Sequence, residues 1–155
     1  MTRRAATLIG LLLAALVAGL APARAEDLFM VRSRQPFPEA MSSLQQAIDN
    51  HGYVLSRVQR VDVGLTHFGF KTDKYRVVFF GKPKQVRALS HAHPMLIPYL
   101  PLKIAIFAEG RETLLVAANP DDFKRFFHDK ALNSVFDGWA KDLRGILDQV
   151  RESAD

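Results

Sequence analysis

The 155-residue chain contains no cysteine. This absence excludes disulfide bonds, thiolate metal sites, a cysteine nucleophile and a lipid-modified N-terminal cysteine. The sequence also lacks a phosphate-binding glycine loop, a dinucleotide fingerprint, a Ser-His-Asp pattern and any internal repeat. Because no known catalytic pattern is present, we expect a non-enzymatic protein that uses no cofactor.

The first residues have the pattern of a signal peptide. Two arginines precede an apolar run over residues 8–20, and Ala23-Arg24-Ala25 is a small-x-small cleavage site. The run is shorter than the roughly 20 residues that a membrane-spanning helix needs. We predict that residues 1–25 are removed and that the mature chain begins at Glu26 in the periplasm, with no membrane attachment. An uncleaved membrane anchor is the alternative.

Removal of this segment changes the charge of the protein. The whole chain has 21 lysines and arginines against 16 acidic residues, and a calculated pI of about 9.7. The predicted signal contains three of the arginines and no acid, so 18 basic residues remain against the same 16 acids. A nearly balanced, exported protein is a poor candidate for binding nucleic acid, and we expect no such partner.

The mature chain, residues 26–155, has the length of one domain. Strands are predicted at residues 28–34, 53–61, 75–80, 100–107 and 114–118. Helices are predicted after Pro36, at 84–90 and at about 131–150, with a short helix or turn inside 63–71 and another short helix that carries Phe123, Phe126 and Phe127. This order predicts an α+β fold, with a mostly antiparallel sheet of about five strands and helices packed on one face.

The segment Leu100–Phe107 is predicted to be a largely buried strand that the rest of the sheet joins. Pro98 and Pro101 bracket its start, and an acidic turn over residues 109–112 closes it. Branched and aromatic residues of strand length lie between these breakers. The last predicted helix has an apolar stripe with a period near 3.6 residues, so we expect it to cover the sheet.

These elements together resemble a known family, the bacterial domain of unknown function numbered 302. The resemblance covers roughly residues 29–146. It rests on Gly52-Tyr53 before one strand, Phe79-Phe80-Gly81-Lys82-Pro83 at the end of another, Leu100-Pro101-Leu102-Lys103-Ile104 at the start of a third and Asn119-Pro120 after the hairpin. The resemblance implies a TATA-binding-protein-like fold with the order β-α-β4-α and a homodimer. It implies no activity and no catalytic residues.

The loop His91-Ala92-His93-Pro94-Met95 is the sharpest candidate site. Two imidazoles two residues apart on an extended segment can face one ion. Imidazole with thioether suits copper, whereas imidazole alone suits zinc or nickel. His91, His93 and Met95 are therefore candidate metal ligands, with His67 or His128 as a further ligand. The alternative is a solvated loop in which His91 caps the preceding short helix.

Basic residues form a second candidate site. Arg57, Arg76 and Lys103 lie in three predicted strands, and Lys82 follows one of them. We expect the three strand residues to share the uncovered face of the sheet, where they would bind an anionic small ligand or an acidic protein partner. The alternative is a solvated face with acids nearby.

The remaining groups indicate structure rather than chemistry. Two carboxylate pairs, Asp62 with Asp73 and Asp121 with Asp122, have no neighbouring base or nucleophile, and the second pair fits the cap and first turn of a helix. The aromatic residues near the C-terminus are predicted to be core: Phe123, Phe126, Phe127, Phe136 and Trp139. The function we expect is an exported binding or interaction domain, and periplasmic handling of copper or zinc is the alternative.

Overall fold

The computed structural model describes residues 27–153, so the predicted signal peptide lies outside the described residues. The elements follow the order β1 (Leu28–Ser33), α2 (Phe37–Asn50), β2 (Val54–Arg60), α3 (Val61–His67), β3 (Tyr75–Gly81), α4 (Pro83–Ala92), the 3-10 helix η1 (Pro94–Tyr99), β4 (Leu102–Glu109), β5 (Glu112–Ala118), the 3-10 helix η2 (Pro120–Arg125) and α5 (Lys130–Glu152). Within residues 27–153, no helix is long and apolar enough to cross a membrane.

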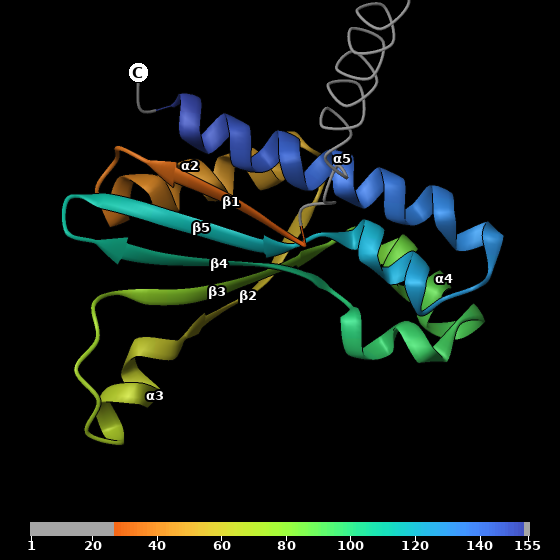
Figure 1. The fold of residues 1–155 in the computed structure, drawn as a ribbon, viewed down its shortest axis with the longest axis horizontal. Coiled ribbons are helices and arrows are strands. Elements are labelled where there is room, and N and C mark those ends of the chain that lie inside the picture. The colour runs from red at the N-terminus through yellow and green to blue at the C-terminus, as the bar shows by residue number, and fades with distance from the viewer. Residues whose placement is uncertain (1–26, 154–155) are drawn as a thin grey trace, which may run out of the picture.

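The five strands form one antiparallel sheet in the order β1-β5-β4-β3-β2. The helices α2 and α5 run side by side and pack on the same face of it (Figure 1). The predicted α+β class, with an antiparallel five-stranded sheet and helices on one face, is confirmed. The centre of the sheet is β4, the strand that the sequence marked as the one the others join.

The long helix α5 covers the sheet because its apolar residues recur every three to four positions. Its N-cap is Asp129, whose side chain accepts a hydrogen bond from the backbone N–H of Ala131 at 2.9 Å. The buried stripe of the helix consists of Leu132, Phe136, Trp139, Ala140, Leu143, Ile146, Leu147 and Val150. These residues meet the buried strand positions, such as Ile104 and Ile106 of β4, in one core.

Three local predictions are corrected by the structure. The strand β4 begins at Leu102 rather than Leu100, since Pro101 has no N–H to donate to a neighbouring strand. The cap of η2 is Asn119, which accepts the N–H of Asp121 at 3.0 Å, so the acids of that turn follow the cap. Phe126 is not part of the core, because its side chain points into solvent beyond the last turn of η2.

Candidate functional site

The face of the sheet that α2 and α5 do not cover is largely apolar. One row of paired positions crosses all five strands through Met30, Val116, Ala105, Val77 and Gln59. A second row runs from Arg32 of β1 through Leu114 of β5 and Phe107 of β4 to Tyr75 of β3. Because side chains alternate across a strand, these residues all point away from the helices. We call this surface the open face.

The two ends of the open face differ in their charged residues. At one end, Arg57 and Lys103 are both exposed and both pair in register with Phe79 of β3. At the other end, Glu109 and Glu112 stand opposite each other, and Arg32 forms ion pairs with both. Arg57 and Lys103 have no ion-pair partner within residues 27–153, whereas Glu109 and Glu112 share Arg32 as a partner and have Arg111 in the turn between them.

Arg76 does not share this face, so the prediction that Arg57, Arg76 and Lys103 lie together is wrong for Arg76. The reason is the period of the strand: Arg76 alternates with Val77 and therefore points with Val78 toward the helices. There the guanidinium lies 5.7 Å from the centroid of the Phe37 ring. It also forms an ion pair with Asp62, and the two side chains are each only 15% exposed. The hydrogen bond from Arg76 lowers the pKa of the Asp62 carboxyl.

Lys82 is also engaged in a structural contact. Its Nζ lies 3.1 Å from Oδ2 of Asp142 on α5 and 4.3 Å from the centroid of the Tyr53 ring. The hydroxyl of Tyr53 donates to the same carboxylate oxygen at 2.7 Å. Burial, the hydrogen bond to Asp142 and the negative charge of that carboxylate, in this order, raise the pKa of Tyr53. This group of three joins the end of β3 to α5, and the ligand-binding role of Lys82 stays a prediction.

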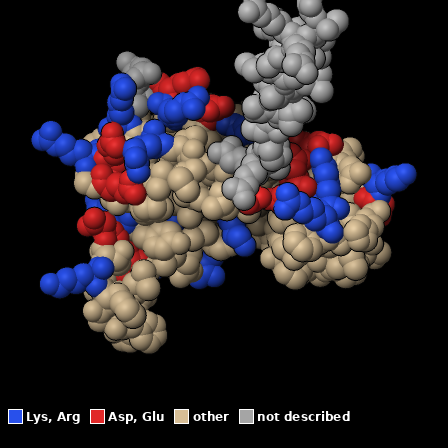
Figure 2. Space-filling model, viewed as in Figure 1, with Lys and Arg blue, Asp and Glu red and all other residues tan. Residues whose placement is uncertain are grey.

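The segment that joins β2 to β3 projects from the sheet as an arm built on α3 (Figure 1). Its end carries few charged side chains (Figure 2). Phe68 is 78% exposed and Phe70 is 63% exposed, with Gly69 between them at a positive φ of 85°. None of the predicted sites included this apolar end, although two phenylalanines separated by glycine in a polar segment are a visible signal.

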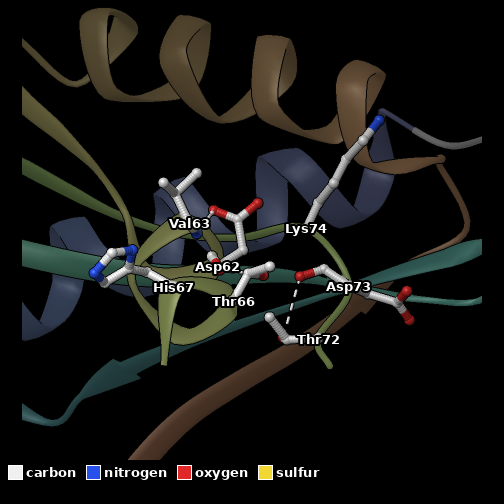
Figure 3. Close-up of a pocket in the computed structure, with 7 residues that line it drawn as sticks. All are labelled: Asp62, Val63, Thr66, His67, Thr72, Asp73 and Lys74. Carbon is white, nitrogen blue, oxygen red and sulfur yellow. Dashed lines mark hydrogen bonds between the residues drawn. The ribbon is translucent and has the colours of Figure 1, made fainter. Parts of the chain in front are cut away.

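A polar hollow of about 590 Å³ opens between α3 and the start of β3 (Figure 3). Both carboxylates of the first predicted pair, Asp62 and Asp73, line it, together with His67. Its polar groups are largely used within the chain: Asp62 pairs with Arg76, and Thr66 donates to the carbonyl of Asp62 at 2.8 Å. The hollow therefore has no free acid–base pair in contact, and we assign it no chemistry.

The titration of Asp62 gives a testable consequence of this ion pair. Replacing Asp62 by asparagine is expected to lower the free energy of unfolding at neutral pH by about 1 kcal/mol, because a charge-assisted hydrogen bond is lost. Since the folded-state pKa lies below the ordinary value of 3.8, the stabilisation is present above that pH and disappears as the pH falls through the folded-state pKa. Urea unfolding of both proteins between neutral pH and strong acid measures the difference.

The matched control for this experiment is Asp73→Asn, which changes an exposed carboxylate that lines the same hollow. A surface change of this kind is expected to alter stability by less than about 0.5 kcal/mol at every pH. A difference between wild type and Asp62→Asn that stays constant into acid would contradict the assignment.

The predicted metal loop is folded differently from the expectation. The helix α4 continues to Ala92, so His91 lies in its last turn and His93 follows as its C-cap, and the expected extended segment is wrong. His93 Nδ1 lies 3.7 Å from a carboxylate oxygen of Asp129, while Met95 is exposed in η1. Within the described residues, no three His, Cys, Asp or Glu side chains converge on one point. The metal role of His91, His93 and Met95 stays a prediction.

Comparisons with known proteins agree with the fold. The family model "Domain of unknown function DUF302" matches residues 29–150. A crystal structure of an uncharacterized conserved protein DUF302 from Bacillus stearothermophilus aligns with a TM-score of 0.74 at 18% identity, over 82% of this chain and all of that one. No curated protein matches the chain. At this identity the structural match shows a shared fold only, and the likeness to the TATA-binding-protein fold stays a prediction.

Proposed function

We propose that this chain, which belongs to the DUF302 family, is an exported, non-enzymatic binding domain that works as a homodimer in the periplasm. The observation that carries the proposal is the open face. Its central row is half-buried or exposed and apolar from Met30 through Val116 and Ala105 to Val77. A continuous apolar surface of this kind marks an interaction site in soluble proteins.

The charges at the two ends of the open face favour a second copy as the partner. If two copies stack face to face about a two-fold axis with their strands antiparallel, the basic end of one lies over the acidic end of the other. Arg57 and Lys103 of each copy would then lie near Glu109 and Glu112 of the other copy, so the same contact would occur twice in the interface. An isologous contact must be complementary to itself in this way.

A binding role rather than catalysis is supported by how the reactive groups are used. The sequence has no catalytic motif, Asp62 is paired with Arg76, and Lys82 is paired with Asp142. Both ion pairs join separate elements of the fold, which gives these groups a structural role without any catalytic one.

Native mass spectrometry of the protein purified from the periplasm, without chelators or an affinity metal, tests this proposal. We expect a chain that begins at Glu26 and a dimer that dissociates only on strong dilution. A monomer at micromolar concentration would reject the homodimer, and a chain that retains residues 1–25 would reject cleavage and export.

The same spectrum tests the alternative of metal handling. The contact between His93 and Asp129 at 3.7 Å is the observation that favours it, because an imidazole and a carboxylate both bind zinc. A retained copper or zinc mass that disappears when His91 and His93 are both replaced by alanine would favour metal handling over the proposed function.

A further inference from the structure

A second hollow, of about 440 Å³, lies where the end of β3 meets the start of α4. We call it the β3–α4 pocket. Its apolar lining consists of Val54, Pro83, Val86 and Pro101, and its polar lining consists of Ser56 and Arg87. The volume falls in the range of small-molecule sites, which are mostly apolar with a few polar groups that orient the ligand.

The pocket exists because the first turns of α4 and the residue before β4 approach the backbone of Gly81. A Cβ atom built at Gly81 would lie 2.8 Å from Cγ2 of Val86 and 3.4 Å from Cβ of Pro101. Only glycine lets both side chains pack directly on the strand. A register shift in β2 between Leu55 and Arg57 also leaves Ser56 outside the regular pairing, beside the pocket.

Of the two polar side chains in the lining, Ser56 already has a hydrogen-bond partner within the chain, whereas Arg87 has no acidic partner among the described residues. The hydroxyl of Ser56 donates to the carbonyl oxygen of Phe79 at 3.1 Å. Arg87 is exposed on α4, and no acid pairs with it in residues 27–153. The pocket therefore combines an apolar wall with one uncompensated cation, and it contains no acid of its own.

We propose that the β3–α4 pocket binds an organic anion with an apolar body and a carboxylate head, such as a medium-chain fatty acid. The four apolar residues would bury the body of the ligand, and the burial of apolar area supplies most of the affinity. The planar guanidinium of Arg87 matches a carboxylate with two parallel hydrogen bonds. This inference rests on the proposed binding function and names the class of its ligand.

The test uses isothermal titration of the full mature protein with decanoate and, separately, with decanol. We expect saturable binding of decanoate and at least about tenfold weaker binding of decanol, because a hydrogen bond to a charged group is lost. The variant Arg87→Gln is expected to bind decanoate about tenfold more weakly than wild type and to lose the preference for decanoate over decanol. Changes in backbone amide chemical shifts at Val54, Val86 and Pro101's neighbour Leu102 would locate the site.

Two further variants keep the result decisive. Lys84→Gln removes a neighbouring exposed cation of the same helix that does not line the pocket, and its decanoate affinity should equal that of wild type. Val54→Asp places a negative charge in the exposed lining, where it would repel the carboxylate of decanoate, and should abolish binding. No saturable decanoate binding, or equal affinity in Arg87→Gln and wild type, would overturn the proposal. Native mass spectra of the same samples report the dimer separately, so a failed ligand and a failed homodimer are distinguishable.

Discussion

Replacing Val116 by lysine is expected to convert the dimer into a folded monomer. Val116 occupies the middle of the central row of the open face, between Met30 of β1 and Ala105 of β4. In a two-fold interface the substitution introduces two lysines near the axis, where each ammonium would be desolvated without an acidic partner. Burial of an unpaired charge costs several kcal/mol, so the dissociation constant should rise by at least about 100-fold.

Sedimentation velocity over a dilution series measures this change, with thermal unfolding as the check that the variant folds. The side chain of Val116 points away from the helices, so the lysine can extend into solvent in the monomer. The matched control is Val63→Lys, the same substitution at a half-exposed valine on the α3 arm. The open face is not the interface if Val116→Lys dimerises as wild type does, or if both substitutions weaken the dimer equally.

The arrangement of elements could be predicted because the hydrophobic periods of this sequence change clearly between segments. Apolar residues every three to four positions mark α5, and short apolar runs between glycine and proline mark β3 and β4. The face to which Arg76 points could also have been found. The apolar run Val77-Val78-Phe79-Phe80 hides the alternation of the strand. Arg76 nevertheless lies two and four residues before Val78 and Phe80, so it points to the same face as these two buried residues, the face that the helices cover.

The β3–α4 pocket could not be predicted, because it depends on contacts between segments far apart in the chain. Lys82 illustrates the limit: its partner Asp142 lies 60 residues later, and no local spacing relates the two. Gly81 is a partial case: its lack of a side chain matters because Val86, five residues later, and Pro101, twenty residues later, both pack on it. Sequence patterns indicate which face of an element is apolar, while tertiary packing decides which cations remain without a partner.

The second large effect is expected in the aromatic cluster beneath η1 and η2. Phe136 of α5 is fully buried, with ring centroids of Phe123, Phe127 and Trp139 at 5.6, 5.9 and 5.8 Å. Phe136→Ala should lower the free energy of unfolding by about 3–5 kcal/mol, because it removes the transfer energy of the ring and leaves a cavity that rigid neighbours cannot fill. Urea unfolding with the single tryptophan as the probe measures it.

Phe126→Ala is the matched control, since the sequence places Phe126 in the same apolar set and the structure leaves it 71% exposed. Its cost should stay below about 0.5 kcal/mol. The pair thus separates hydrophobicity from burial: the same atoms are deleted, and only one deletion opens a cavity. Equal losses in the two variants would mean that Phe126 is covered in solution, either by the core or by a second copy. Repeating the measurement with the Val116→Lys monomer distinguishes these two causes, because only a contact with a second copy disappears when the dimer is lost.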